Sequence, residues 1–255
     1  MSDNHARSQL FDSYVQHCSR FNNGPATAAF PDYDLNIKSL LPTDRTAAIL
    51  DFGCGMGQCL AYLQARGYQN VTGIDISRSQ IEYCHSLGLP NAQHVEDSVA
   101  FLLAHPGQFR VIVAFDVIEH LPKSIIIQVL QAIHTALEPG GTFIMRVPNI
   151  AAAIGPWTRY MDFTHETSFD ERSVRQILEL AAYSEPTVRP NQTFYRRKWL
   201  GIGFEIVRSW LYIVLKGIYF LQSPGTENPS IFTIFIYGMG HKASDHDALL
   251  RIHPV

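Results

Sequence analysis

Apolar and polar positions along the middle of the chain predict an alternating series of strands and helices. Short apolar runs, such as residues 47–53 and 70–77, are each followed by a stretch of helical spacing that closes at a glycine, Gly67 or Gly88. The run 109–121 is almost continuously apolar, which is typical of a strand covered on both faces. Because strands and helices alternate in this way, we expect a parallel, doubly wound α/β sheet with right-handed crossovers.

The rest of the chain continues this pattern with longer segments. Residues 123–141 predict a helix that ends at Pro139 and two glycines, and residues 142–149 predict the strand that follows it. Three more elements complete the expected fold: a helix at 169–183 and strands at 186–194 and 231–241. Ligands of such sheets bind beyond the carboxyl ends of the strands. The polar residues at those ends are therefore the candidates for a functional site.

Composition and charge narrow the classes of function. The 255-residue chain has a formal net charge of -3, which argues against a dedicated nucleic-acid binder. Its four cysteines form no C-x-x-C pair, so neither a zinc site nor a disulfide framework is expected. The polar N-terminus lacks the apolar core of a signal peptide, and free thiols suit a reducing cytosol. We therefore expect a cytoplasmic protein with no nucleic-acid partner.

The stretch "ILDFGCGMGQC", residues 49–59, places Gly53, Gly55 and Gly57 directly after a predicted buried strand. Glycines between a strand and a helix let the backbone bend sharply and approach a ligand closely. A dinucleotide site would have its third glycine where Gln58 stands, and no Lys or Arg lies in the turn to meet a phosphate. Gly57 is expected either to face the ligand or to allow close packing of the helix.

Two acids make the expected ligand more specific. Asp51 lies two residues before the first glycine. Asp75 ends the next strand, where an acid can hold both hydroxyls of a ribose. An acidic turn without a basic phosphate partner suits a cationic nucleoside. S-adenosylmethionine, which has a sulfonium, an amino group and no phosphate, fits this description.

These segments together resemble the class I S-adenosylmethionine-dependent methyltransferases. The resemblance rests on "ILDFGCGMG", "VTGIDIS", Asp97, "VIVAFDVIEHLPK" and "LEPGGTFIMRVPN", and it covers residues 47–149 in the family's order and spacing. It implies a Rossmann-like methyltransferase fold, with a mostly parallel sheet and an antiparallel last strand. It also implies S-adenosyl-L-methionine as the cofactor.

The resemblance further implies roles for individual residues of the cofactor site. Asp51, Gly53 and Gly55 would face the methionine part, with Asp51 near its amino group. Asp75 would hold the ribose hydroxyls, and Ile76 would pack on the adenine. Three further positions complete the implied site: Asp97 as acceptor from the adenine amino group, Ser98 beside it, and Phe115 near the methionine.

Two histidines are candidates for the acceptor side. His120 lies in "DVIEHLP" after the fourth strand, and His165 lies in "RYMDFTHETSF", a polar stretch that is typical of an acceptor-binding loop. A hydroxyl acceptor needs its proton removed, usually by His, Asp or Glu. The sequence leaves open which of the two histidines is the base. It shows no compelling cluster of carboxylates for a metal, so no metal site is expected.

The pattern "VPN…RYMDFTHETSF…SVRQIL" resembles a subgroup of bacterial methyltransferases associated with surface polysaccharide synthesis. In that subgroup the aspartate and histidine of D-x-T-H recur, which implies Asp162 and His165 as the acceptor-site pair, with His165 as general base. The "GF" step expected after the helix is replaced by "AAYSEP". We expect O-methylation of a sugar hydroxyl in glycan or glycolipid biosynthesis. C-methylation of a nucleotide-linked deoxysugar, O-methylation of another small molecule, and a non-catalytic cofactor-binding scaffold remain open.

The segment 199–222 is the most apolar part of the chain. Glu205, Arg208 and Lys216 argue against a transmembrane helix, because charges are costly in hydrocarbon. On a helix they fall on one narrow polar stripe beside a broad apolar face. With the basic stretch "YRRK" before it, such a helix suits peripheral contact with an anionic membrane through residues 195–222. Packing on the sheet, covering the active site and forming a homodimer face are the alternatives.

We expect residues 1–255 to form a single methyltransferase domain with five parts. These parts are an N-terminal helical cap (1–45), a cofactor-binding core (46–150), an acceptor loop with a helix and a strand (151–194), an apolar helical insertion (195–230), and the last strand with the tail (231–255).

Overall fold

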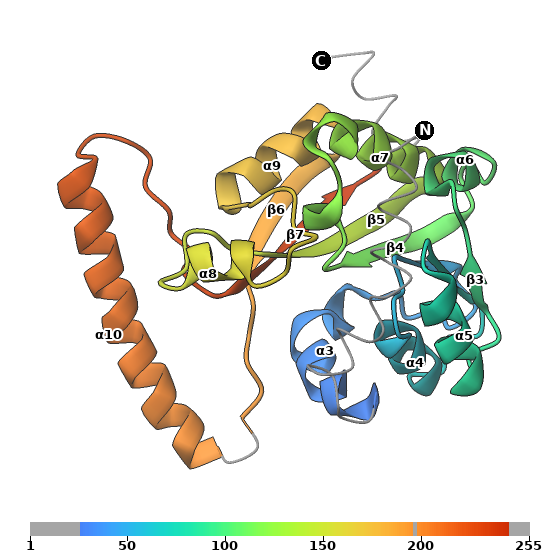
Figure 1. The fold of residues 1–255 in the computed structure, drawn as a ribbon, viewed down its shortest axis with the longest axis horizontal. Coiled ribbons are helices and arrows are strands. Elements are labelled where there is room, and N and C mark those ends of the chain that lie inside the picture. The colour runs from blue at the N-terminus through green and yellow to red at the C-terminus, as the bar shows by residue number, and fades with distance from the viewer. Residues whose placement is uncertain (1–25, 196–197, 245–255) are drawn as a thin grey trace.

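The sheet at the centre of the computed structural model has seven strands in the order β3-β2-β1-β4-β5-β7-β6 (Figure 1). The structure describes residues 26–195 and 198–244. The strands are β1 (Ile49–Phe52), β2 (Val71–Asp75), β3 (Ala92–His94), β4 (Phe109–Phe115), β5 (Leu137–Pro148), β6 (Ser184–Pro190) and β7 (Phe235–His241). Strands β1 to β5 run parallel, and β7 is antiparallel to β5 and β6. The doubly wound α/β fold with an antiparallel last strand is confirmed.

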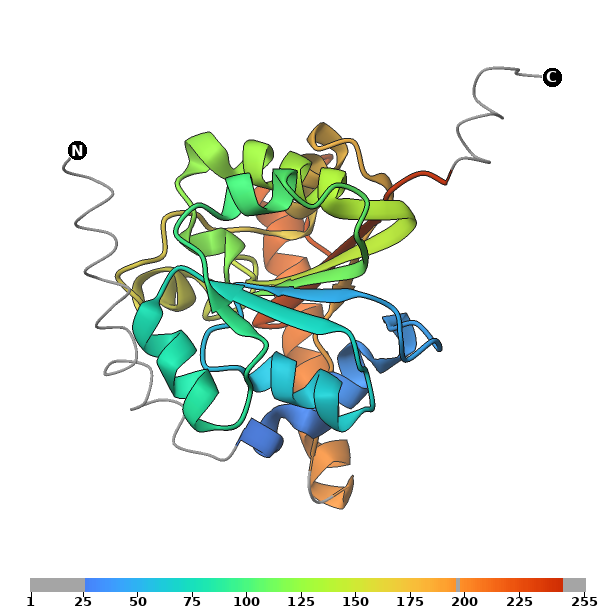
Figure 2. The same ribbon diagram turned by 90° about the vertical axis from the view of Figure 1, so that its right-hand side faces the viewer.

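Helices cover both faces of this sheet (Figure 2). One face packs against α6 (Ser98–Leu103), α7 (Lys123–Ala136) and α9 (Glu171–Leu180). The other face packs against α3 (Phe30–Asn36), α4 (Gln58–Ala65) and α5 (Arg78–Ser86). Strand β4 is covered on both sides, which explains its continuous apolar run. The two layers hold the carboxyl ends of the parallel strands in one row.

Three predicted boundaries differ from those of the structure. Helix α7 ends at Ala136, and β5 begins at once with Leu137, so Pro139 and the two glycines after it belong to the strand. Gly140 has a positive φ of 75°, and the pairing of β4 with β5 shifts register there. Strand β6 starts two residues before the predicted strand and ends at Pro190, and β7 starts at Phe235 rather than residue 231. The N-terminal part of the expected cap, residues 1–25, lies outside the described residues.

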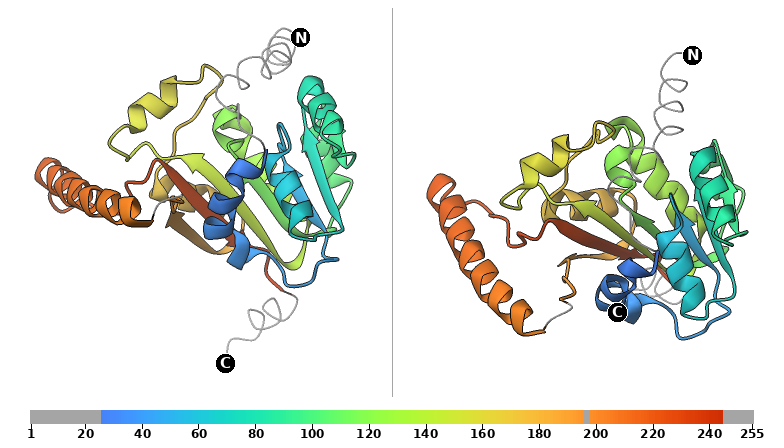
Figure 3. Two further views of the ribbon diagram at one scale, coloured as in Figure 1. Left: turned by 90° about the horizontal axis from the view of Figure 1, so that it is seen from below. Right: turned by 60° about the horizontal axis from the view of Figure 1, so that its bottom comes forward.

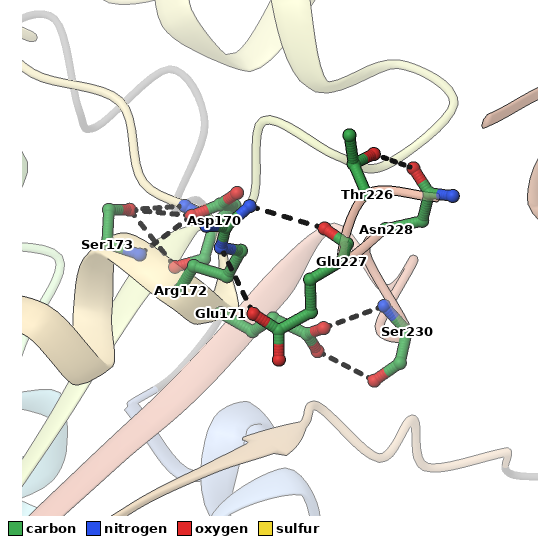
Figure 4. Close-up of polar contacts among 8 residues, drawn as sticks. All are labelled: Asp170, Glu171, Arg172, Ser173, Thr226, Glu227, Asn228 and Ser230. Carbon is green, nitrogen blue, oxygen red and sulfur yellow. Dashed lines mark hydrogen bonds and ion pairs between the residues drawn. The ribbon is translucent and has the colours of Figure 1, made fainter. Parts of the chain in front are cut away.

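Helix α9 and the segment before β7 are joined by polar contacts (Figure 4). Asp170 caps α9, since its carboxylate accepts from Ser173 N–H at 2.8 Å and the Ser173 hydroxyl accepts from Asp170 N–H at 2.9 Å. The carboxylate of Glu171 accepts from the N–H and the hydroxyl of Ser230, at 2.7 and 2.8 Å. Arg172 forms an ion pair with Glu227. These contacts hold residues 227–230, which precede β7, against the start of α9.

The insertion is the helix α10 (Lys198–Gln222), which runs apart from the sheet and is connected to it by two extended segments (Figures 1 and 3). Its less exposed side carries Glu205, Arg208, Tyr212 and Tyr219, which belong to the predicted polar stripe. The rings of Tyr212 and Tyr219 lie 5.8 Å from the ring of Phe232. Most of the apolar face therefore points away from the protein, whereas Ile202, Ile206 and Ile213 line a pocket together with Leu35 and Phe194. No helix within the described ranges has the length and hydropathy that crossing a membrane requires.

Candidate active site

The turn between β1 and α4 has a conformation that glycine alone adopts without strain. Gly53, Gly55 and Gly57 have positive φ angles of 72°, 52° and 78°. A Cβ on Gly53 would lie 2.4 Å from a methyl group of Val117, and a Cβ on Gly55 would lie 2.9 Å from Gln80 Oε1. Glycine is therefore required at both positions by the backbone conformation and by the close approach of Val117 and Gln80.

Gly57 has a packing reason of its own. A Cβ at this position would lie 2.6 Å from Leu89 and 2.9 Å from the sulfur of Cys84, both of which belong to the α5 side of the fold. Cys84 and Cys54 are buried beside the turn. Of the two roles expected for Gly57, the structure shows the close packing of helices.

Asp75 is held against the glycine turn. Its Oδ2 accepts from Gly55 N–H at 2.9 Å, and its Oδ1 accepts from Ser77 N–H at 2.8 Å. Burial raises the pKa of the Asp75 carboxyl, while these two backbone donors act in the opposite direction. The carboxylate of β2 therefore lies directly beside the turn after β1.

Asp51 has a buried oxygen that lacks a partner. The residue is 2% exposed, and its Oδ2 has no hydrogen-bond partner. Burial, followed by the charge of Asp75, raises the pKa of Asp51 to about 7. An unpaired buried carboxylate is costly, and a cationic ammonium group would remove that cost. The unpaired Oδ2 could accept a hydrogen bond from the amino group of the methionine part. This agrees with the role that the resemblance implies for Asp51.

The adenine side of the expected site lies at the ends of β2 and β3. Ile76 is 42% exposed, as a residue that packs on a ligand ring should be. Asp97 is exposed, and its carboxylate caps α6 by accepting from Ala100 N–H at 2.9 Å. Ser98 is the first residue of that helix. The structure thus places these three residues at the same edge of the sheet as Asp75.

Phe115 ends β4 inside an aromatic and cationic cluster that the sequence did not predict. Its ring stacks on Tyr33 of α3 at 5.8 Å and meets Tyr237 of β7 edge-on at 5.7 Å. The guanidinium of Arg146 lies 5.6 Å from the Phe115 ring and forms an ion pair with Asp116. Asp116 has a positive φ of 57°. An arginine within the apolar stretch "TFIMRVPN" was the one signal of this cluster in the sequence.

The two candidate histidines meet on the acceptor side. His120 belongs to the short 3-10 helix η3 (Ile118–His120), which follows β4, and His165 belongs to the loop after α8 (Gly155–Tyr160). Their ring centroids are 4.7 Å apart, and the ring planes are inclined at 67° to each other. Burial, together with the neighbouring His165, lowers the pKa of His120 to about 4, so its imidazole is neutral at physiological pH. The sequence predicted both residues but not that they touch.

Glu119 completes this group. The side chain is 1% exposed, and neither carboxylate oxygen has a hydrogen-bond partner. Burial, with the charge of Asp116 as a second cause, raises its pKa well above the ordinary value. One ligand-type atom each of Glu119, His120 and His165 lies within 4.8 Å of the others. The sequence indicated no metal cluster, because these residues come from two segments more than 40 positions apart.

The acceptor loop is held against η3 by its backbone. Glu166 N–H and Thr167 N–H both donate to the carbonyl oxygen of Glu119, at 2.8 and 3.1 Å. The Asp162 carboxylate accepts from Thr164 N–H at 2.8 Å and from the Thr164 hydroxyl at 2.6 Å. That hydroxyl lies 2.8 Å from His120 Nδ1. Asp162 thus reaches His120 through Thr164, and its backbone carbonyl accepts from His165 N–H at 3.3 Å. The predicted acceptor-site pair of Asp162 and His165 stays a prediction.

Comparison with known proteins decides the family. The sequence profile of the methyltransferase domain matches residues 26–183, which is more than half of the chain. The chain belongs to the methyltransferase domain family. The methyltransferase is dependent on S-adenosylmethionine, and the glycine turn, the orphaned Asp51 oxygen and the adjacent Asp75 fit that cofactor.

Solved structures show the same fold at low sequence identity. A methyltransferase dependent on S-adenosylmethionine from Archaeoglobus fulgidus superposes with a TM-score of 0.66 at 17% identity, covering 91% of this chain and 100% of that one. Phosphoethanolamine N-methyltransferase 2 from Haemonchus contortus, solved with S-adenosyl-L-methionine, gives 0.57 at 13% identity over 92% and 60% of the two chains. At these identities the likeness concerns the fold alone.

Relatives with a closer sequence carry a more specific name. The ubiquinone biosynthesis O-methyltransferases of Albidiferax ferrireducens and Ralstonia nicotianae are 39% and 37% identical to the methyltransferase over 98 and 97 residues. Each match covers 36% of this chain and spans only about two fifths, 38% and 40%, of the relative. The expected association with surface polysaccharide synthesis gains no support from these relatives.

Proposed function

We propose that this methyltransferase transfers the methyl group to a hydroxyl oxygen of a small acceptor. The observation that carries the proposal is the group of Glu119, His120 and His165, whose first two members follow Val117, the residue that packs against Gly53 of the cofactor turn. Oxygen acceptors need a proton removed as they attack, whereas the other parts of the reaction depend mainly on positioning. The names of the relatives, which are O-methyltransferases, support the same reaction type.

The hydrogen bonds of His165 assign its proton. His165 Nδ1 lies 2.8 Å from the carbonyl oxygen of Thr158, which only accepts, so Nδ1 carries the hydrogen. Nε2 is therefore the nitrogen that takes a proton from the acceptor. Once bound, the cofactor supplies an activated methyl group. The protein holds the hydroxyl near His165 and excludes water with the loop that Glu166 and Thr167 attach to η3.

Two observations favour different classes of acceptor. The relatives' name favours a hydroxyl of an aromatic ring, as in the precursors of quinones. The D-x-T-H pattern at Asp162 and His165 favours the sugar hydroxyl expected from the sequence. We give the aromatic hydroxyl priority, because the ubiquinone O-methyltransferases share measurable sequence identity with this chain. The polysaccharide subgroup is supported only by the short D-x-T-H pattern.

A methyl-transfer assay with labelled cofactor tests the proposal. We expect transfer to a dihydroxylated aromatic ring, with nucleotide-linked sugars as the second set of acceptors. His165→Gln should lower kcat about 100- to 10,000-fold, the usual contribution of a general acid or base, with cofactor affinity unchanged. His241→Gln is the matched control, because His241 lies beside Thr142 at the opposite end of the strands from the candidate site. Unchanged turnover of His165→Gln would refute the assigned role.

The outward apolar face of α10 supports a second part of the proposal, contact with a membrane surface. Trp199, Phe204, Trp210 and Phe220 are exposed on this helix, together with several branched aliphatic residues. A soluble monomer rarely exposes so large a continuous apolar surface. The helix is also preceded by the basic stretch "YRRK" in the sequence, which suits anionic lipid head groups.

Vesicle flotation tests this contact and separates it from dimer formation. The protein should float with vesicles that contain anionic lipid, and Trp210→Glu should reduce the bound fraction. The control Glu82→Gln changes an exposed acid on α5 and should float like the unchanged protein. A protein that stays at the bottom of the gradient but sediments as a dimer would instead support the homodimer alternative.

A further inference from the structure

A pocket between α10 and α3 is lined by different residues from those of the candidate active site. Its volume is about 660 Å³, within the range of about 300–1,000 Å³ that is usual for sites of small molecules. Six apolar side chains from three segments line it: Leu35 of α3, Phe194 of the connection that follows β6, and Ile202, Ile206, Trp210 and Ile213 of α10. Each of them is at least 42% exposed, so the described residues leave this apolar surface uncovered.

Hydrogen bonds attach the connection, residues 191–195, to α3 on one side of the pocket. Gln192 N–H donates to Asn36 Oδ1 at 2.8 Å, and Asn36 Nδ2 donates back to the carbonyl oxygen of Gln192 at 2.9 Å. Phe194 N–H donates to Asp32 Oδ1 at 2.9 Å. Phe194 and Leu35 therefore belong to two segments that are held together.

The same connection contacts α10 on the other side of the pocket through Tyr195. The ring of Tyr195 stacks on the ring of Phe204, with centroids 5.9 Å apart and planes inclined at 5°. A Cβ on Gly201 would lie 2.9 Å from Tyr195, so the tyrosine packs against helix backbone that bears no side chain. The connection thus bridges the two helices between which the pocket lies.

The polar groups of the lining already have partners. The Glu205 carboxylate forms an ion pair with Arg208, and the Ser209 hydroxyl donates to the carbonyl oxygen of Glu205 at 2.8 Å. Arg208 Nη1 lies 3.5 Å from the Thr193 hydroxyl. A polar ligand would gain little from side chains that are bound to one another in this way. The lining therefore favours a ligand that consists of hydrocarbon where it enters the pocket.

We propose that this pocket binds an acyl chain of a membrane phospholipid. Trp210 and the three isoleucines of the lining also belong to the exposed apolar face of α10, so the pocket is continuous with the surface that is proposed to contact a membrane. The inference rests on that proposed contact, because the bilayer supplies the lipid. The volume is that of a small-molecule site, whereas a stable interface with a second protein needs about 800 Å² of surface on each partner.

Binding of a single-chain lipid to the full-length protein tests the pocket without vesicles. The probe is lauroyl-lysophosphatidylglycerol, which is kept below its critical micelle concentration and titrated by calorimetry. We expect saturable binding of one molecule per chain. Glycerophosphoglycerol, which has the same head group without an acyl chain, should not bind. Absence of saturable binding of the lysolipid, or equal binding of glycerophosphoglycerol, overturns the inference.

Two isoleucines of α10 provide a matched pair of variants. Ile213 lines the pocket and is 60% exposed, whereas Ile218 is 45% exposed and does not line it. Ile213→Gln should weaken binding of the lysolipid about 10-fold, the usual effect of losing the burial of one isoleucine, and Ile218→Gln should bind it like the unchanged protein. Calorimetry with S-adenosylmethionine shows that both variants are folded. Equal weakening in the two variants would mean that the lipid binds to the open face of the helix, and the pocket would fall.

The outcomes separate the pocket from the proposed membrane contact and from a dimer. If the protein floats with anionic vesicles but binds no lysolipid, the membrane contact stands and the pocket falls. If only Ile213→Gln loses affinity for the lysolipid and the protein does not float, the pocket stands and the membrane contact falls. If the unchanged protein sediments as a dimer and Ile213→Gln sediments as a monomer, a second copy of the chain occupies the pocket and the inference falls.

Discussion

Replacing Asp51 by Asn should stabilise the protein at high pH while weakening its binding of the cofactor. Burial raises the pKa of Asp51 to about 7, from 3.8 for an ordinary aspartate carboxyl. The folded protein therefore holds a proton on Asp51 more tightly than the unfolded chain does. Below about pH 4 the Asp51 carboxyl is protonated in both the folded and the unfolded protein, so it does not lower the free energy of unfolding. As the pH rises from 4 to 7, the unfolded chain ionises first, and stability is lost.

The magnitude follows from the size of the shift. A difference of about three pKa units at about 1.36 kcal/mol each amounts to about 4 kcal/mol of lost stability at pH 8. At pH 5 less than half of this cost has developed, about 1.7 kcal/mol. Asp51→Asn removes the charge and nearly preserves the volume. In a chain of this size, about 4 kcal/mol corresponds to a rise in Tm of about 10 °C at pH 8.

Urea unfolding and calorimetry together make the measurement. The free energy of unfolding of Asp51→Asn and of the unchanged protein is compared at pH 5 and pH 8, with Glu82→Gln as the exposed control. Titration with S-adenosylmethionine should show about 10- to 100-fold weaker binding to Asp51→Asn, the value of a lost charge-assisted hydrogen bond. A gain in stability that is equal at the two pH values, or no gain at all, would refute the pKa argument. Unchanged cofactor affinity would refute the role of the orphaned oxygen.

The remaining predictions concern the turn and the ion pair beside it. Gly53→Ala should destabilise the fold by about 2–4 kcal/mol in urea unfolding, because of its positive φ and the contact of 2.4 Å with Val117. Gly67→Ala, which also has a positive φ but meets no atom within 4 Å, should cost only about 1 kcal/mol. Asp116→Asn should cost about 1–3 kcal/mol, less than a fully buried pair, since the side chain of Asp116 is 37% exposed.

The cofactor half of the site was predictable from the sequence because it depends on local order. Asp51 and the glycines come directly after a strand, and Asp75 ends the next one. In a parallel sheet the ends of neighbouring strands meet, so the fold class alone placed these residues together. The hydrogen bond from Gly55 to Asp75 is the direct consequence of that topology. No contact between segments that are distant in the sequence had to be predicted for this half of the site.

The acceptor half depends on contacts between distant segments, and there sequence reasoning reached its limit. The pattern identified His120 and His165, but not the 4.7 Å between their rings. It named Asp162 and His165 as a pair, but not the contact of the Asp162 carboxylate with His120 through Thr164. Tyr33 and Tyr237 carried no signal at all, since an aromatic residue in a helix or a strand is ordinarily part of a core. Such contacts are set by how the loop after β5 returns to η3.

The helix α10 shows why a correct pattern can still leave the function of a segment undecided. The sequence correctly places Glu205, Arg208 and Tyr212 on one stripe, but a helix with one polar face is compatible with either face pointing to solvent. In ordinary surface helices the apolar face packs on the core. Here the polar stripe faces the protein, where Arg208 pairs with Glu205 and Tyr212 lies beside Phe232. Most of the apolar face is consequently exposed among the described residues, and this exposure supports the membrane contact proposed above.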